Sequence, residues 1–318
     1  MKTLQFLPFL CFAVILLVSP FECASTNQND SEYWNQLSSE ALHASLLNKY
    51  NQAAKNVILF LGDGMGISTV TAARTLKRQN EQLDELGFEK FPNVAMVKTY
   101  NVDYTVADSA GTATAYLSGV KTNKGVIGVN GNIKRKDQDC ENILRNRVNS
   151  VFTHAIASGK STGIVTTTRL TDATPSGAYA HVSDRDYEGS SPITDPRCKD
   201  IARQLIEDSP GSEFNVILGG GKIDKAHHEN QAFLALYDTL AFDRAINRAL
   251  NMINLMETLV IVTADHSHGF TLNGYAKRDS NIFGFAEKKS NGTAYTSLMY
   301  ATGPGNRAKA NETIQETG

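Results

Sequence analysis

The sequence lacks several features that define large classes of proteins. Its net charge is only -2 and its pI is about 6.4, so no broad basic surface exists and nucleic acid is not an expected partner. It contains no internal repeat and no low-complexity linker. An apolar run of ten residues, 9–18, is too short to span a bilayer. With 318 residues, 41% of them hydrophobic, the chain can nevertheless bury a full core.

The short apolar run has the flanks of a secretory signal peptide. Lys2 precedes it and the small residues around Ala24 and Ser25 follow it, so we expect residues 1–25 to be removed and the mature protein to be extracellular or at the cell surface. Sequons at Asn29, Asn291 and Asn311 are possible glycan sites. The last nine residues are polar, and no membrane anchor is expected from them.

Cysteine is scarce. Cys11 and Cys23 belong to or border the leader, which leaves Cys140 and Cys198 in the mature chain. In an oxidising compartment we expect these two to form a disulfide, worth about 4 kcal/mol in the chain-entropy model. Two buried thiols are the alternative.

Apolar strand-like segments alternate with helical ones along the rest of the chain. This order predicts an α/β fold with a mostly parallel central sheet and helices on both faces, in one domain over residues 26–318. An amphipathic helix over 31–50 is expected to form an arm. The predicted strands are 56–61, 93–99, 161–168, 214–218 and 258–263, and the other predicted helices are 67–79, 109–117, 150–158, 198–207 and 223–251.

Ser109 opens the Ala-rich helical segment that stops at Gly119. A serine at or near a helix N-cap lies beside free N–H groups and the positive end of the helix dipole, where a phosphoryl group on its hydroxyl would be stabilised. The alternative is that Ser109 only caps the helix.

Potential metal ligands follow two predicted strands and begin a helix. Asp63 follows the first strand, Asp265 and His266 follow the last, and Asp224 and His228 lie four residues apart on one helix face. Each pattern is ordinary by itself. Together, imidazole nitrogens and carboxylate oxygens favour a zinc site.

Segment 168–185 adds further polar groups, including Arg185. A guanidinium near such a site can donate two N–H groups to phosphate oxygens. By itself, Arg185 would be read as a surface arginine.

The chain resembles the alkaline phosphatases of the metazoan secreted or membrane-anchored type. The resemblance rests on FLGDGMG, VADSAGTATAYLSGVKTN, TTTRLTDATPSGAYAH, IDKAHH and TADHSHGF, which lie between about residues 56 and 270. It implies hydrolysis of phosphate monoesters at alkaline pH through a phosphoserine intermediate, by a homodimer with the 31–50 arm in its contact.

The resemblance also implies a role for each matched residue. Ser109 would be the nucleophile and Arg185 would hold the phosphate. One zinc would bind Asp63, Asp265 and His266, and a second would bind Asp224 and His228. Magnesium would bind Asp63 and Thr174. Asp172 and His268 would lie in the outer shell of these sites, and His268 could instead complete the second zinc site.

The chain departs from the family pattern at two points. A strand ending in Glu-Gly-Gly precedes the family's Ile-Asp-x-x-x-His motif, and its Glu binds magnesium; here Gly219 takes that place, which predicts an internal deletion near 219–222. The family's third ligand to the second zinc lies in a segment expected beyond Gly318. We therefore expect a shortened phosphatase of low activity, with apolar surfaces exposed where a strand is lost.

Two other kinds of function compete with this interpretation. A Ser-His-Asp hydrolase would need Gly-x-Ser-x-Gly around its nucleophile, and Ser109 is preceded by Asp108 and followed by Ala110. The signature around Ser109 also favours monoesterases over phosphatase-fold sulfatases and phosphodiesterases. A catalytically weak or inactive secreted binding protein remains the main alternative.

Overall fold

The computed structural model describes residues 53–219, 223–288, 292 and 294–301, together with Ser39, Glu40 and His43. The chain divides into two units, Met1–Gln52 and Ala53–Gly318, and the account below concerns the second. The predicted signal peptide and the sequons at Asn29, Asn291 and Asn311 lie outside the described residues. Of the predicted 31–50 arm, only the three isolated residues are described, and all are helical.

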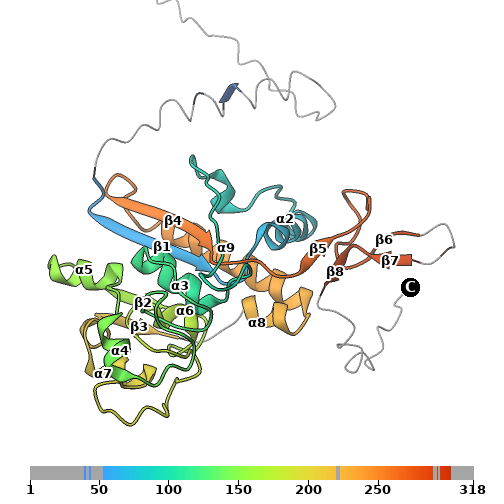
Figure 1. Ribbon diagram of the computed structural model, residues 1–318. Helices are drawn as coiled ribbons and strands as arrows, with labels where there is room; N and C mark the ends of the chain where they lie inside the picture. The colour runs from blue at the N-terminus through green and yellow to red at the C-terminus, as the bar shows by residue number, and fades with distance from the viewer. Residues whose placement is uncertain are drawn as a thin grey trace, which may run out of the picture. The chain divides into compact units, whose positions relative to one another are not determined.

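Helices separate the first four strands along the body, and the last five strands follow one another without a described helix between them (Figure 1). The strands are β1 (Asn56–Gly62), β2 (Gly163–Val165), β3 (Val216–Leu218), β4 (Thr258–Ala264), β5 (Phe270–Leu272), β6 (Phe285–Lys288), β7 (Ala294–Thr296) and β8 (Leu298–Tyr300). The α-helices are α2 (Ile67–Glu81), α3 (Ser109–Ser118), α4 (Cys140–Arg145), α5 (Val151–Ala157), α6 (Ala173–Ser176), α7 (Ile201–Glu207), α8 (Ile223–His228) and α9 (Ala232–Leu250), and the 3-10 helices are η1 (Gly87–Lys90) and η2 (Gly211–Glu213).

The longest strands, β1 and β4, lie side by side in parallel (Figure 1). Their register runs from Asn56 opposite Thr258 to Gly62 opposite Ala264. The carboxyl ends of both strands therefore meet at one edge, where ligand sites of α/β proteins form. β2 and β3 form a second parallel pair, while β5 with β8 and β6 with β7 are antiparallel. The predicted α/β class is confirmed; among the described residues, its parallel strands form two pairs instead of one continuous sheet.

The two faces of the β1–β4 pair differ. On one face the ring of Phe60 meets Phe242 of α9 edge to face, with centroids 6.1 Å apart. On the other face Val57 and Leu59 lie opposite Leu259 and Ile261, and their exposed fractions are 38% to 63%. Parallel sheets are normally covered on both faces. Among the described residues, this apolar face of the β1–β4 pair is left exposed.

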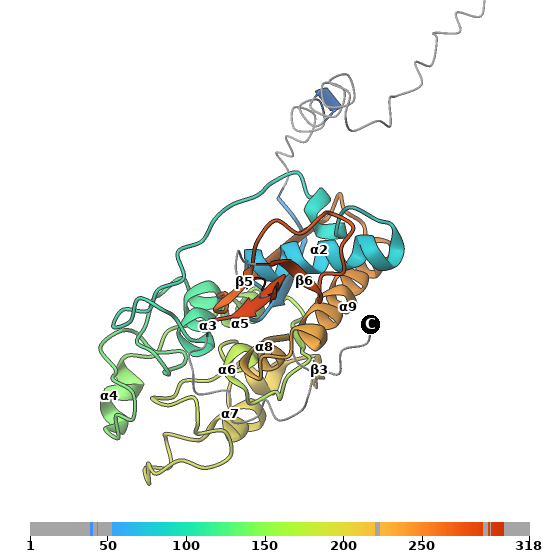
Figure 2. The same ribbon diagram turned by 90° about the vertical axis from the view of Figure 1, so that its right-hand side faces the viewer.

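Within the part of the chain that the structure describes, three apolar clusters make up the core. The first joins α3 and α7 around Tyr179 and Ile201, and the second joins α2 and α9 around Leu76 and Leu240. Figures 1 and 2 show α2 and α9 side by side.

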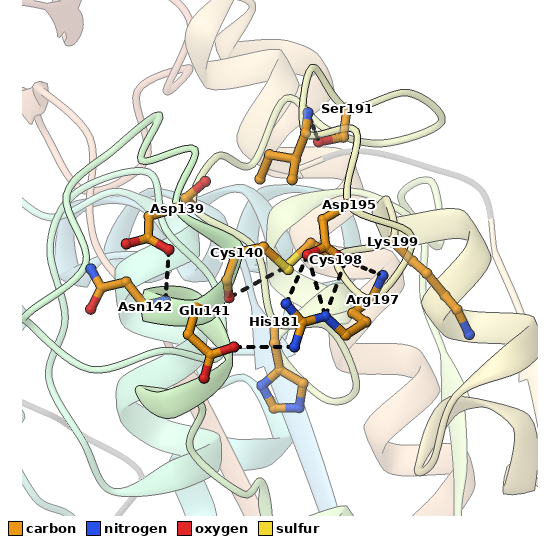
Figure 3. Close-up of a disulfide and its surroundings, with 12 residues drawn as sticks. Asp139, Cys140, Glu141, Asn142, His181, Ser191, Asp195, Arg197, Cys198 and Lys199 are labelled. Carbon is orange, nitrogen blue, oxygen red and sulfur yellow. Dashed lines mark hydrogen bonds and ion pairs between the residues drawn. A yellow bond between two sulfur atoms is a disulfide. The ribbon is translucent and has the colours of Figure 1, made fainter.

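The third cluster surrounds the predicted disulfide between Cys140 and Cys198, which is confirmed (Figure 3). Arg197, next to Cys198, forms ion pairs with Asp195 at 2.8 Å and with Glu141 at 3.1 Å. The guanidinium therefore links the two segments that the disulfide joins.

Two predicted elements are wrong. Residues 93–99 form no strand, and Val94 and Met96 are 98% and 90% exposed, because no described strand lies alongside to pair with them. The helix predicted over 223–251 is two helices, α8 and α9, since Asn230 adopts φ 57° and ends the first. The other elements predicted after residue 53 are present, some slightly longer and some shorter; β2, for example, keeps only three of the eight residues predicted over 161–168.

Candidate active site and metal centre

Ser109 is the first residue of α3. Asp108 is the N-cap, and its side chain accepts a hydrogen bond from the Gly111 N–H at 3.2 Å. Ser109 is buried, and its hydroxyl donates to Asp63 Oδ1 at 3.2 Å and lies 3.0 Å from His266 Nε2. The serine that the sequence singled out therefore contacts the side chains that follow β1 and β4.

Asp63, Asp265 and His266 form a first group of potential metal ligands. One ligand atom from each lies within 4.8 Å of the others. Asp265 is fixed in place, because Oδ1 accepts from the Gly64 N–H at 2.9 Å and Oδ2 accepts from the Thr112 hydroxyl at 3.2 Å.

Thr174 of α6 also reaches this group. Its hydroxyl donates to Asp63 Oδ2 at 2.5 Å, on the carboxylate oxygen that does not contact Ser109. Asp63 thus lies between Ser109 and Thr174.

Asp224, at the start of α8, belongs to a second group with His266 and His268. Its Oδ1 lies 2.7 Å from His268 Nε2, and its Oδ2 lies 3.3 Å from His228 Nε2. His268 is half-buried, with 12% of its side chain exposed, whereas the His228 side chain is 68% exposed. The predicted pair of Asp224 and His228 is therefore in contact, and a third imidazole joins it.

The charges in this region fit a bound cation. Burial, followed by the nearby carboxylates of Asp265 and Asp224, raises the pKa of Asp63 well above its ordinary value. Burial opposes ionisation of Asp224 as well, but hydrogen bonds from His228 and His268 lower its pKa overall. A divalent cation would relieve the repulsion among the carboxylates, and mixed nitrogen and oxygen donors are suited to one.

Arg185 lies beside the same helix N-terminus. Its guanidinium contacts Asp108 Oδ2 at 3.2 Å and Asp172 Oδ1 at 3.5 Å. Asp172 is itself the N-cap of α6, where it accepts from the Ala173 N–H at 2.9 Å. Two carboxylates therefore hold Arg185 close to the segment that carries Ser109.

Sequence reasoning missed Asp108 as a site residue. Besides capping α3 and pairing with Arg185, it accepts from the Gly125 N–H at 3.1 Å and from Asn101 Nδ2 at 3.0 Å. Burial opposes its ionisation, but the backbone hydrogen bonds and Arg185 lower its pKa overall. Asp108 directly precedes Ser109 in the sequence, and this position could have indicated that it belongs to the site.

The contacts of His266 differ from those of a catalytic triad. A triad acid binds the ring nitrogen that faces away from the serine. Here the same atom, His266 Nε2, lies 3.0 Å from Ser109 and 3.4 Å from Asp265, while Nδ1 faces the Ser267 carbonyl at 3.1 Å. This geometry speaks against the rival serine-hydrolase interpretation.

A family model described as alkaline phosphatase matches residues 54–222 and 220–317. The chain belongs to the alkaline phosphatase family. The match falls into two parts that meet at 220–222, and this junction lies outside the described residues.

Individual alkaline phosphatases support this membership. The tissue-nonspecific isozyme of Gallus gallus is 35% identical over 402 aligned positions, which cover 87% of this chain and 77% of that protein. A membrane-bound alkaline phosphatase of Bombyx mori is 32% identical, over an alignment that covers 81% of this chain and 68% of that protein. The alkaline phosphatase from the Antarctic bacterium TAB5 shares the fold, with a TM-score of 0.55 and 23% identity. The match covers 78% of this chain and 88% of that chain.

Proposed function

We propose that this chain hydrolyses phosphate monoesters through a phosphoserine intermediate at Ser109. The contact of the Ser109 hydroxyl with both Asp63 and His266, at the N-terminus of α3, carries the proposal. A nucleophile in this position has acceptors for its proton and a helix dipole that favours the phosphoryl group.

Two zinc ions and one magnesium ion are the cofactors we propose. Asp63, Asp265 and His266 would hold the zinc beside Ser109, Asp224 and His228 would hold the second zinc, and Asp63 and Thr174 would hold magnesium with Asp172 close by. When bound, such ions lower the pKa of hydroxyl groups and neutralise charge on the transferred phosphoryl group.

The side chains themselves perform the remaining steps. Arg185 orients the ester through paired N–H groups, while Asp108 and Asp172 fix the plane of its guanidinium. The Ser109 oxygen attacks phosphorus, the bond to the ester oxygen breaks, and the alcohol leaves with a proton. Water then attacks the phosphoserine, the bond between phosphorus and Ser109 breaks, and inorganic phosphate leaves with the serine hydroxyl restored.

We further propose that an internal segment near 219–222 is deleted and that this lowers activity. The alignment to the Gallus gallus protein is longer than the whole 318-residue chain, so it contains gaps, and the family match is interrupted at 220–222. Gly219, where the family has a magnesium-binding Glu, offers no carboxylate. Weaker magnesium binding and slower turnover are the expected consequences.

A secretory route, a location outside the cell or at its surface, and a homodimer complete the proposal. The predicted leader and the confirmed disulfide support an oxidising compartment. Among the described residues, the helices are all too short or too polar to cross a membrane.

The test is hydrolysis of an aromatic phosphate monoester at alkaline pH with added zinc and magnesium. Ser109→Ala should abolish turnover and the labelling of protein by radioactive phosphate, whereas Ser118→Ala, at the other end of α3, should keep both. Turnover that survives in Ser109→Ala would refute the nucleophile. A folded chain that binds metal without turnover would instead favour the binding-protein alternative.

A further inference from the structure

Arg135 contacts the residues on both sides of Arg185. Its Nε and Nη2 donate to Asp184 Oδ1 at 3.1 Å and 2.9 Å, and Nη2 also donates to Asp186 Oδ2 at 2.8 Å. The Asp184 side chain is fully buried, whereas 37% of the Arg135 side chain is exposed. One guanidinium near the surface therefore holds the residue before Arg185 and the residue after it.

The chain next to Arg135 is tied to the same segment. The Lys136 N–H donates to the Ser183 carbonyl at 2.9 Å, and the Ser183 hydroxyl donates to the Asp137 carbonyl at 2.6 Å. Lys136 adopts φ 67°, in the left-handed region that residues other than glycine seldom enter. Such a backbone persists only where the surrounding contacts hold it, so the turn at 135–137 is fixed against residues 183–186.

Gly125 links Arg135 to the backbone of Arg185. Its carbonyl accepts from the Arg185 N–H at 2.8 Å, and its own N–H donates to Asp108 Oδ1 at 3.1 Å. A side chain at Gly125, where φ is 79°, would begin only 2.6 Å from Arg135 Cδ. Arg135 therefore packs directly against the residue that fixes both the Arg185 backbone and the N-cap of α3.

The guanidinium of Arg185 depends on this support. Its contacts with Asp108 at 3.2 Å and Asp172 at 3.5 Å orient the plane of the group. The point from which the side chain extends is set instead by the backbone at 185, which is held between Gly125 and the residues that Arg135 contacts. A shift of that backbone would carry the guanidinium away from its place beside Ser109.

We propose that Arg135 is a positioning residue for Arg185. By holding the segment 184–186 and packing against Gly125, it places the Arg185 guanidinium where it can donate to the phosphate of the substrate. This inference rests on the proposed function for the role of Arg185. A misplacement of about 1 Å can cost about 100-fold in rate, so a residue remote from the reacting atoms can control how well phosphate is held.

The competing role is stability alone, in which Arg135 only neutralises a buried carboxylate. Arg135→Lys separates the two roles, because lysine keeps the charge but replaces the planar fork by a single ammonium. Arg197→Lys is the matched control. Arg197 likewise pairs with two carboxylates, of Asp195 at 2.8 Å and Glu141 at 3.1 Å (Figure 3). Neither of these carboxylates adjoins Arg185 in the sequence.

The first readout is affinity for inorganic phosphate, measured by calorimetry on the full chain loaded with zinc and magnesium. Arg135→Lys should weaken binding by about tenfold, as expected of a residue that orients a binding group, and Arg197→Lys should leave it unchanged. If Arg135 acts through Arg185, adding Arg135→Lys to Arg185→Ala has no further effect on affinity. Unchanged affinity in Arg135→Lys, or an equal loss in both backgrounds, overturns the proposal.

The second readout does not require phosphate to bind. In a crystal structure of Arg135→Lys the Arg185 guanidinium should have moved from its two carboxylate acceptors, whereas in Arg197→Lys it should keep both. A guanidinium that has not moved in Arg135→Lys overturns the proposal. Urea unfolding checks that each variant is folded. Should Arg135→Lys not fold, Asp186→Ala breaks the same link at a side chain that is 69% exposed, and the same displacement is expected.

The outcomes keep this inference apart from the proposed function. If wild type binds phosphate but hydrolyses no ester, the hydrolytic function fails, and the effect of Arg135→Lys on affinity still decides the positioning role. If wild type binds no phosphate, the role of Arg185 fails, and the crystal structures decide whether Arg135 positions it. Weaker phosphate binding that disappears in the Arg185→Ala background, together with a displaced guanidinium, supports the inference.

Discussion

His181 should make the folded protein sensitive to mild acid. Its Nδ1 contacts the Gly128 carbonyl at 2.6 Å, and its backbone N–H donates to Gln204 at 2.9 Å, in the region close to the disulfide (Figure 3). Burial lowers the pKa of this imidazole to about 4. We therefore expect His181→Gln to flatten the dependence of stability on pH, because glutamine keeps an N–H donor without a titrating group.

The magnitude follows from the two pKa values. The unfolded chain binds the proton below about pH 6.5 and the folded protein only below about pH 4, so stability contributed by neutral His181 is complete above 6.5 and is lost as pH falls towards 4. Between about pH 7.5 and about pH 5 this amounts to about 2 kcal/mol of unfolding free energy. His227, whose pKa burial also lowers to about 4, is present in both proteins and cancels in the difference.

The assay is urea unfolding of the metal-free, disulfide-intact protein at these two pH values. On acidification from about pH 7.5 to about pH 5, the free energy of unfolding should fall by about 2 kcal/mol more in wild type than in His181→Gln. His154→Gln, an exposed histidine on α5, serves as the control and should follow wild type. Equal pH dependence in wild type and His181→Gln would refute the reasoning.

Three further changes test other parts of the molecule. Arg185→Lys replaces a fork of N–H donors by a single ammonium, so KM and the inhibition constant for phosphate should rise about tenfold, and unchanged values would contradict its role. Cys198→Ser opens the 58-residue separation to Cys140 and should cost about 4 kcal/mol in urea unfolding, a loss that reductant should reproduce in wild type. The Lys77 ammonium lies 2.6 Å from the buried carboxylate of Asp243, and Lys77→Met leaves that charge without its cation. Thermal and urea unfolding should show that the free energy of unfolding falls by about 3–5 kcal/mol. Much of this loss should be recovered when Asp243→Leu is added.

Parts of the candidate site and of the fold could be predicted from local signals in the sequence. Asp63 and Asp265 could be placed because each directly follows a continuous apolar strand, and such ends converge in a parallel sheet. The start of α3 at Ser109 could be placed because capping and the stop at Gly119 are local signals.

Features that depend on distant partners could not be predicted. Residues 93–99 carry a strand-like pattern. A strand also needs a neighbouring strand to pair with, and the periodicity of a sequence does not show whether such a neighbour exists. Asn230 interrupts the 223–251 segment by a left-handed backbone, without the glycine or proline that usually marks such a break. The contact of His268 with Asp224 joins residues 44 positions apart and has no local signature.

The pairing of β1 with β4 has a consequence for how the protein is made. Asn56 leaves the ribosome about 200 residues before its partner Thr258. At about 5–20 residues per second, β1 waits for about 10–40 s with an unpaired edge. Asp63 and Ser109 are made early, but Asp265 and His266 join them only after about 200 further residues beyond Asp63 have been made. Assembly of the candidate site therefore has to wait until β4 has been made and has paired with β1.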